Sequence, residues 1–412
     1  MKFPSMVFRS IEVVETSSVA ATLLAGYSEV DSGGIRPLMG VSRFGAAFGY
    51  NPFELYNRGI VTSPNGFVFG QIGKGKSALV KSYLARMYLH GYPSVVLDPK
   101  GEYQGLANHF GFDVVRFIDS RAGVNPFVSS SHDDTLASEL NREMAERAIC
   151  AMCKRDLTEY EGLAISEALH GIERDLNFQS LRHQLVSLDQ DGGPKSWLGA
   201  SQPGDLAAVV AACDSLLGSG LVARSSDVGN IASAIYLGIL VIDLSQVFGT
   251  DLYSLAVTLV LGAIRAAQFE HQRRPLVVAI DEIWALTQNE KAARWLQSYW
   301  KLSRSLGIAN LGVAHRYTDL GSGASEQGRG VAEGLMMDSE TLVLFGMGKA
   351  AAERLCDEFG LVPELAVLLS RLGPGIALWQ IGKLRYLVEH QLTKTELTLC
   401  NTDSAMMAKH FV

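Results

Sequence analysis

The chain has 412 residues, which suffices for one large domain or two domains of medium size. Apolar residues make up 48% of it and charged residues 19%, so the composition excludes global disorder and allows a sizeable buried core. The formal net charge of −7 excludes a general basic field, so that any contact with nucleic acid has to be local.

Residues 1–60 form the first region and have a strand-like pattern, interrupted by the turn signal Asp31-Ser32-Gly33-Gly34. We predict a β-rich N-terminal appendage over residues 1–60; the alternative is the remnant of a larger upstream domain. The opening residues, Met1-Lys2-Phe3-Pro4, lack the long hydrophobic core of a signal peptide.

A glycine-rich loop follows the apolar run Phe67–Phe69 and opens a helical pattern. Glycines let the backbone curl so that its N–H groups point inward at phosphates, and the helix adds the positive end of its dipole. We predict a phosphate loop that binds ATP, with Lys76 on the β- and γ-phosphates and Ser77 on Mg²⁺; the alternative is a turn with a chance lysine. The loop consists of Gly70, Gln71, Ile72, Gly73, Lys74, Gly75, Lys76 and Ser77.

A second strand, predicted over Val95–Leu97, ends in the string Asp98-Pro99-Lys100-Gly101-Glu102, and a third strand is predicted over residues 114–118. Two interpretations of the string stay open. Lys100 contacts the nucleotide or a neighbouring subunit, or the string is a turn ahead of a helix that begins at Glu102, which we favour slightly.

Residues 132–232 have a mainly helical pattern and are richer in polar residues. Thr158-Glu159-Tyr160-Glu161 is a capping box, and further helices are predicted over 177–188 and 205–217. We therefore predict an all-α insertion domain over 132–232 within an ATPase domain that comprises 61–131 and 233–412. Cys150 and Cys153 have metal-like spacing but no second pair, which favours buried helix cysteines over zinc.

The strand pattern resumes at Ile239–Asp243 and alternates with helices near 252–269 and 291–306. Alternating strands and helices predict an α/β fold with a mostly parallel sheet flanked by helices. The remaining strands are expected over 276–280, 308–314, 341–345, 376–380 and 384–389.

An acidic pair, Asp281-Glu282, ends the β-branched run Leu276–Ile280. Such a run suits a strand buried on both faces, and ligands of open α/β sheets lie at the carboxyl ends of the strands. We predict that Asp281 holds Mg²⁺ and that Glu282 polarises the water that attacks the γ-phosphate. The alternative is an ordinary charged strand end.

Two further patterns concern the cellular setting. The odd number of cysteines, five, indicates a reducing compartment. No apolar run reaches the length of about 18 residues that spans a membrane, and the longest one, Ile231–Ile242, is interrupted by Ser233 and Gly238. We therefore predict no integral membrane segment and a cytoplasmic location, peripheral at the inner face of the cell membrane, where the protein docks onto a membrane partner.

The order of four strings resembles the FtsK/HerA superfamily of P-loop ATPases, and the resemblance covers most of residues 50–400. The strings are the phosphate loop, Asp98–Glu102, Asp281–Leu286 and Ser303–Ile308. The string after the acidic pair is similar to the D-E-A-W string of conjugal-transfer and type IV secretion ATPases. The resemblance implies a RecA-like fold, a homo-hexamer with ATP between subunits, and movement of DNA or protein through a central channel at membrane-embedded secretion components.

The resemblance also assigns two further site residues. Many members carry Thr-Gln after the strand that ends here at Ala314, and this glutamine senses the γ-phosphate. This sequence carries His315 instead, which either donates a hydrogen bond to phosphate or has no role in the reaction. The departure leaves open how hydrolysis is coupled to movement.

Arg304 is the candidate for an arginine finger supplied in trans. Within the helix predicted over 291–306, it points away from an apolar stripe. The alternative is a solvated surface arginine, and Arg316 is the second candidate. The stripe consists of Trp295, Tyr299, Leu302 and Leu306.

Other classes of function remain open on the sequence alone. A kinase built on the same loop requires an acceptor site, of which the sequence has no sign. A nucleotide-binding scaffold would bind without turnover, and a HerA-like DNA pump would work outside secretion. The cargo, whether double-stranded DNA, single-stranded DNA or protein, stays open.

Overall fold

The computed structural model describes residues 36–112, 114–116, 123–128, 134–191, 194, 205–224, 231–270, 273–315 and 326–400. Within them, eleven strands form one sheet in the order β2-β1-β11-β10-β9-β3-β8-β7-β4-β6-β5. The strands are β1 (Leu38–Ser42), β2 (Ala47–Gly49), β3 (Gly66–Phe69), β4 (Ser94–Asp98), β5 (Val114–Arg116), β6 (Ile239–Asp243), β7 (Leu276–Ile280), β8 (Ile308–Ala314), β9 (Thr341–Phe345), β10 (Ile376–Ile381) and β11 (Leu384–His390).

Seven neighbouring strands, from β9 to β5, pair in parallel, and the other four pair antiparallel. The prediction of a mostly parallel sheet flanked by helices is confirmed. The central strands are buried on both faces, as their continuous apolar runs require. Because the strands are parallel, their carboxyl ends meet at one edge of the sheet.

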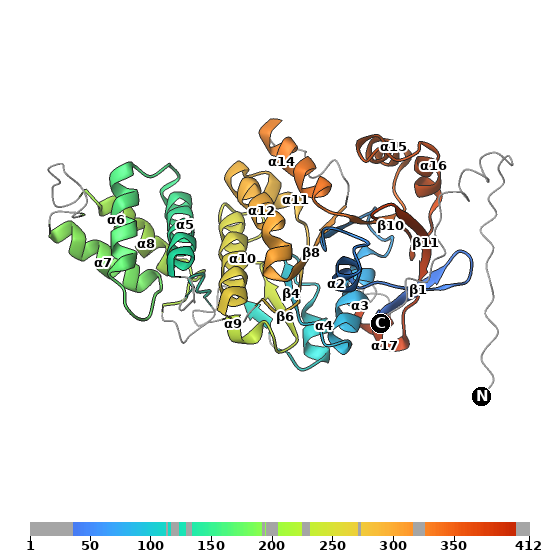
Figure 1. Cartoon of the computed structure of the whole chain (residues 1–412), viewed down its shortest axis with the longest axis horizontal. Helices are drawn as coiled ribbons and strands as arrows, with labels where there is room; N and C mark the ends of the chain where they lie inside the picture. Colours follow the sequence, from blue (N-terminus) through green and yellow to red (C-terminus); the bar gives the residue numbers. More distant parts are fainter. Residues whose placement is uncertain are drawn as a thin grey trace, which may run out of the picture.

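Helices cover both faces of this sheet (Figure 1). Side chains alternate between two cores along β7: Leu276, Val278 and Ile280 pack on the side of helices α10 and α12, and Val277 and Ala279 pack on the side of α3. The helices near the sheet are α2 (Pro52–Asn57), α3 (Lys76–Leu89), α4 (Gln104–His109), α9 (Ile231–Ala234), α10 (Leu252–Glu270), α11 (Trp284–Thr287), α12 (Glu290–Leu302), the 3₁₀ helix η1 (Ser303–Leu306), α14 (Glu326–Met337), α15 (Lys349–Glu358), α16 (Glu364–Arg371) and α17 (Lys394–Cys400).

Helix α10 corrects the prediction about apolar runs. It has the length and hydropathy of a membrane-crossing helix, which the sequence prediction had excluded for every run. In the structure, 78% of its apolar window is buried within the protein. The buried window is the pattern of a core helix that covers one face of a sheet.

A group of four helices lies between β5 and β6 in the chain and forms one end of the molecule in Figure 1. It consists of α5 (Asp134–Cys153), α6 (Glu159–His170), α7 (Phe178–Gln190) and α8 (Ala207–Gly218). The predicted capping box of α6 is present, since Thr158 accepts from the amide of Glu161 and the Glu161 carboxylate accepts from that of Thr158. Cys150 and Cys153 both lie in α5 as predicted, but they are half-buried rather than buried.

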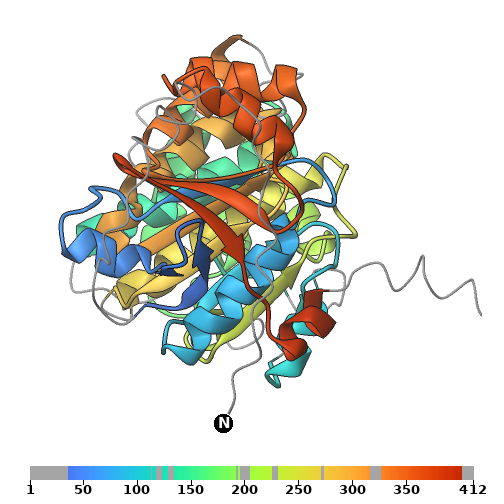
Figure 2. The same cartoon turned by 90° about the vertical axis from the view of Figure 1, so that its right-hand side faces the viewer.

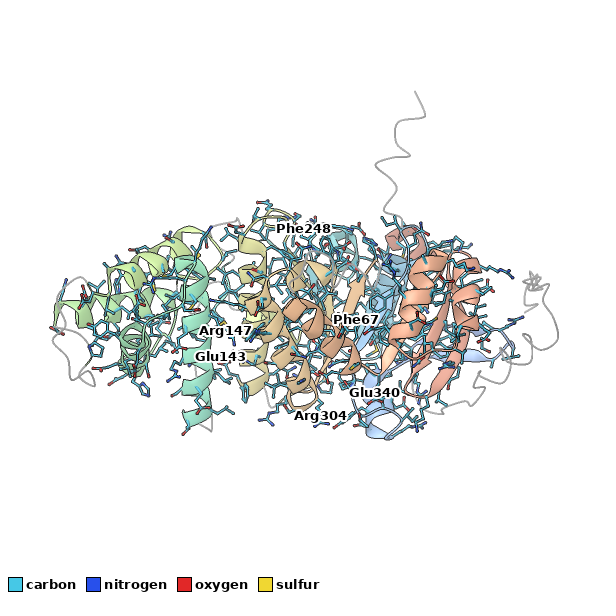
Figure 3. All side chains as sticks on the ribbon, turned by 90° about the horizontal axis from the view of Figure 1, so that it is seen from above. Phe67, Glu143, Arg147, Phe248, Arg304 and Glu340 are labelled. Atoms are coloured by element: carbon cyan, nitrogen blue, oxygen red, sulfur yellow. The ribbon has the colours of Figure 1, made fainter. Side chains whose placement is uncertain are left out.

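Three ion pairs join this helical group, or the loop after α5, to the sheet-side elements. Arg265 Nη1 of α10 lies 2.9 Å from Glu143 Oε2 of α5, and Figure 3 shows Glu143 where α5 faces α10. Lys154 pairs with Asp251 at 2.9 Å, and Lys291 pairs with Asp156 at 2.5 Å. Arg265 is buried, so the first of these pairs is the least exposed to solvent.

The two ends of the described chain meet at the antiparallel side of the sheet. Residues from the predicted N-terminal appendage form β1 and β2, and β1 pairs with β11 rather than standing apart. Figure 2 views the molecule from this side and shows α15 and α16 on one side of the sheet, with α3 and α17 on the other. Residues 1–35, including the turn signal at 31–34, lie outside the described residues.

Candidate functional site

Four strand ends bring the predicted site residues to one edge of the sheet. Phe69 of β3 pairs with Ala314 of β8, so the phosphate loop begins beside His315. Ile280 of β7 pairs with Gly312 of β8 on one side and with Leu97 of β4 on the other. Strand β8 therefore separates the loop strand from the strand that carries the acidic pair. The predicted proximity of loop, acidic pair and His315 is present in the structure.

The loop between β3 and α3 has the backbone that its glycines permit. Gly70 has φ +156°, and a Cβ there would lie 2.4 Å from Phe345 Cβ, so only glycine fits. Gly75 has φ +108° at the N-cap of α3, where no side chain caps the helix. The first turn of α3 thus presents backbone N–H groups without a side-chain acceptor, as an anion-binding helix start requires.

The loop is braced by the segments around β9 and β10. The Gln71 amide donates to Gly346 O at 3.0 Å, and Lys74 O accepts from the Gly375 amide at 3.0 Å. Lys74 Nζ donates to Leu372 O at 3.3 Å, so the side chain of Lys74 contacts a residue outside the loop. These hydrogen bonds join the loop to the neighbouring segments. The Lys74 side chain takes part in them, whereas the Lys76 side chain does not.

Lys76 points into the loop. Its side chain is buried, and its Nζ donates to Gly70 O at 2.5 Å and to Gln71 O at 3.2 Å. A buried ammonium group inside a curled backbone suits a polyphosphate chain. Ser77 and Asp281 add a hydroxyl and a carboxylate, which are the hard oxygen ligands that Mg²⁺ prefers. The residues present therefore fit a nucleotide with Mg²⁺.

Asp281 is buried at the end of β7, and its Oδ1 accepts from the Glu282 amide at 2.9 Å. Burial, followed by the charge of the neighbouring Glu282, raises the pKa of Asp281 to about 7. A divalent cation at this carboxylate would reverse that shift, because it stabilises the ionised form.

The Glu282 side chain is only 3% exposed, and both of its carboxylate oxygens accept hydrogen bonds. Its Oε1 lies 2.7 Å from His315 Nε2 and also accepts from Lys100 Nζ, while its Oε2 accepts from the indole N–H of Trp284. Burial alone would raise the pKa of Glu282, but the hydrogen bonds from His315, Lys100 and Trp284 outweigh it and lower the pKa to about 2. Glu282 also has φ +49°, which is costly for a residue with a side chain.

The string Asp98–Glu102 is a turn, and Lys100 also reaches the acidic pair. Asp98 accepts from the amides of Lys100 at 3.2 Å and Tyr103 at 2.8 Å, which closes the turn. The helix after it, α4, begins at Gln104 rather than at Glu102. The contact between Lys100 and Glu282 was not predicted. The string shows only that Lys100 follows a strand, whereas the contact depends on β4 lying next to β7.

Arg304 lies far from these residues in its own chain. It belongs to η1, just before β8, and is exposed. At about 3.3 Å per residue, the seven residues of β8 separate it from the carboxyl edge by roughly 20 Å. Figure 3 shows Arg304 at the periphery and Phe67 of β3 in the interior. Arg316 lies outside the described residues.

The predicted stripe beside Arg304 needs a correction. Trp295, Tyr299 and Leu306 are buried as predicted, but Leu302 is 46% exposed and Trp300 is buried instead. The reason is that the buried face of α12 also includes Leu296 and Trp300, so it is centred to one side of the predicted stripe and leaves Leu302 at its margin.

A parallel sheet, a phosphate loop and a strand between the loop strand and the acidic strand define the fold of a RecA-like P-loop ATPase. Comparison by sequence agrees with this class: residues 63–195 match the family described as the central domain of helicase HerA. The resemblance of the chain to HerA-type ATPases, stated above from the motifs, is therefore confirmed.

Solved structures show the same fold. VirB4 of Thermoanaerobacter pseudethanolicus is 20% identical over 89% of this chain and 99% of that one, with a TM-score of 0.66. The unbound bacterial conjugative coupling protein TrwB, lacking its first 70 residues, is 16% identical over 91% of both chains, with a TM-score of 0.55. TrwB with a non-hydrolysable ATP analogue is 18% identical over 80% of this chain and 86% of that one, with a TM-score of 0.54. No protein with a curated description matches the sequence at a significant level.

Proposed function

We propose that this chain is an ATP-hydrolysing motor of the conjugation or type IV secretion class. The observation that carries the proposal is the carboxylate pair Asp281-Glu282, held one strand away from a phosphate loop whose lysine points inward. A site that only binds nucleotide has no need of a second buried carboxylate next to the metal ligand. The similarity of the fold to VirB4 and to a conjugative coupling protein supports the conjugation setting.

The residues of the loop have separate roles in this proposal. The amides of Gly70 to Gly75 bind the phosphates, Lys76 neutralises their charge, and Ser77 and Asp281 hold Mg²⁺, which neutralises charge on the phosphates. Glu282 orients the attacking water and accepts its proton once its own oxygens are released. His315, which contacts Glu282, reports the state of the nucleotide to that carboxylate.

Arg304 completes the site from a neighbouring subunit. Its distance from the loop of its own chain and its exposure support a role in trans. The proposal therefore requires a homo-oligomer, and the resemblance favours a hexamer that docks onto membrane-embedded secretion components and moves DNA or protein. The predicted division into an appendage over 1–60, an ATPase domain and an insertion over 132–232 belongs to the same proposal.

The experiment that tests this function measures ATP turnover and ATP binding in the wild-type protein, Lys76→Ala and Glu282→Gln. Lys76→Ala is expected to lose both binding and turnover. Glu282→Gln is expected to bind ATP and lose turnover. Retained turnover in either variant would reject the assignment of the site.

A second candidate, a nucleotide-binding scaffold without turnover, is favoured by one observation. Both oxygens of Glu282 are occupied by neighbouring side chains. The scaffold predicts that wild-type protein binds ATP without hydrolysing it at any oligomer size, with or without DNA. A HerA-like DNA pump predicts turnover that DNA stimulates in the absence of secretion components.

A further inference from the structure

The carboxylate of Glu282 is held by one donor from each neighbouring strand. Strand β7 lies between β4 and β8 in the sheet. Lys100 follows β4 and His315 follows β8, and both contact Oε1 of Glu282. Lys100 Nζ and His315 Nε2 are themselves 3.2 Å apart, so the two donors converge on one oxygen.

This arrangement prevents Glu282 from acting on water. A general base needs a lone pair directed at the proton that it accepts. Here Oε1 takes two donors, Oε2 takes the indole of Trp284, and the side chain is 3% exposed. One lone pair of Oε2 takes no donor, but the side chain is shielded from solvent, so a water molecule reaches the carboxylate only when one of these neighbouring side chains moves away.

Of the three donors, Lys100 is the one whose side chain can move away from Glu282 most easily. Its backbone is fixed, because Asp98 accepts from its amide and from that of Tyr103. Its side chain, in contrast, is 36% exposed and carries the ammonium group on a flexible four-carbon chain. His315 is attached directly to the end of β8 and is less exposed, at 27%. The lysine therefore sits between solvent and the buried carboxylate.

The surroundings of Lys100 also allow its ammonium group to exchange the Glu282 carboxylate for an anion bound at the loop. Burial by itself would lower the pKa of Lys100, but the hydrogen bond to Glu282 and the charges of Glu282, Asp281 and Glu102 outweigh burial and raise the pKa. His315, its neighbour, follows Ala314, which pairs with the last residue of the loop strand. An anion held by the loop thus enters beside an ammonium group that is already charged and partly solvated.

We propose that Lys100 is a positioning residue that latches Glu282 until the terminal phosphate of a nucleotide offers its ammonium group a competing anion. When Lys100 turns to the phosphate, Glu282 keeps the His315 contact and regains an acceptor site for water. The latch rests on the proposed function. It also explains why Glu282 keeps a costly φ of +49°, since such a conformation persists where neighbouring contacts impose it.

The first readout of the test needs no turnover. Trp284 donates to the latched carboxylate, so its fluorescence reports release; its contribution is isolated by subtracting the emission of the matching Trp284→Phe protein from that of each variant. In the wild type, MgATP is expected to shift this emission. In Lys100→Met, the emission without nucleotide is expected to equal that of the nucleotide-bound wild type. Lys100→Arg is expected to restore the wild-type behaviour.

Lys349→Met is the matched control, because Lys349 forms an exposed pair with Glu353 at 3.8 Å outside the site. It is expected to behave as the wild type in every measurement. An emission from Lys100→Met that equals the wild type without nucleotide would overturn the latch, as would a wild-type emission that MgATP leaves unchanged.

The second readout is turnover. Lys100→Met is expected to raise kcat several-fold and to raise KM, because Glu282 is free while a phosphate contact is lost. A fall in kcat as deep as that of Glu282→Gln would contradict the latch. If the wild type binds ATP without hydrolysing it, the proposed function fails, and the emission measurement still decides the latch.

Discussion

The two edges of the parallel sheet differ in how their charged side chains are held. At the carboxyl edge, Lys76, Asp281 and Glu282 are buried, and neighbouring groups hold them by hydrogen bonds. At the opposite edge, Arg304 is exposed in the turn before β8. Buried charges persist only where they are paired or hydrogen-bonded, whereas an exposed arginine remains available to another surface. Under the proposed function, one copy of the chain carries most of an ATP site at the carboxyl edge, and Arg304 at the opposite edge supplies the cation that completes the site of a neighbouring copy.

Removing the cation of the loop tests the carboxyl edge most severely. Lys76→Ala leaves the loop without its inward ammonium group, and we expect turnover to fall below detection. ATP binding, measured by calorimetry, is expected to fall with it. Lys74→Ala is the matched control, because Lys74 Nζ donates to Leu372 O outside the loop. If Lys74→Ala and Lys76→Ala lose turnover and ATP binding equally, both lysines act only by keeping the loop folded, and Lys76 has no separate role in binding phosphate.

The opposite edge is tested by mixing subunits. An arginine finger contributes roughly 10³–10⁵ in rate in known systems, so Arg304→Ala is expected to lose that order of activity. When it is titrated into wild-type protein, activity should fall more steeply than the fraction of variant, because each variant subunit disables a neighbour's site. Arg294→Ala, which removes an exposed arginine paired with Glu290, should leave activity unchanged. A strictly proportional loss would place the whole site within one subunit.

Within the carboxyl edge, the two carboxylates are expected to separate binding from chemistry. Glu282→Gln preserves the shape and the indole contact and removes the base, so turnover should fall by about 10²–10⁴ with ATP affinity retained. Asp281→Asn should weaken Mg²⁺-dependent binding as well. These outcomes are measured by single-turnover kinetics and by titration with and without Mg²⁺. If ATP binding depended on Mg²⁺ in the same way in Glu282→Gln and Asp281→Asn, the separate roles of the two carboxylates would be contradicted.

A smaller effect concerns the ion pair that joins the helical group to the core. Burial raises the pKa of Glu143, but Arg265 and Arg147 outweigh it and the pKa is lowered. A carboxyl with a depressed folded pKa stabilises the fold above its unfolded pKa, and this contribution is lost as pH falls through the folded pKa. Glu143→Gln should therefore cost about 1 kcal/mol at pH 7 and less at pH 3, as measured by urea unfolding. Glu159→Gln, at an exposed position in the first turn of α6, is the control.

Much of the sheet and part of the site could be predicted from the sequence, for a physical reason. Strands such as β8 and β9 lie between clear turn signals and are apolar throughout, so their observed bounds match the predicted ones. The site residues follow strands, and parallel strands bring their ends together. The contacts of Lys100 and Trp284 with Glu282 were missed, because they depend on which strands are neighbours and on the left-handed backbone of Glu282.

The N-terminal and helical predictions show the same limit. Pairing of β1 with β11 joins residues about 350 positions apart, and no local pattern encodes such a pairing. The stripe beside Arg304 failed at Leu302, because the buried face of α12 is centred nearer to Leu296 and Trp300 than the predicted stripe. Local patterns thus predicted the elements, whereas the long-range neighbours had to come from the structure.

The most direct test of a site shared between two edges is ATP turnover per subunit measured against oligomer size. Protein separated by size, or diluted through its assembly range, would be assayed with MgATP in the presence and absence of DNA. A site shared between copies predicts negligible turnover from single copies and a steep rise when copies assemble, because only then does Arg304 reach a phosphate loop. Equal turnover per subunit at every size, or none at any size, would contradict it.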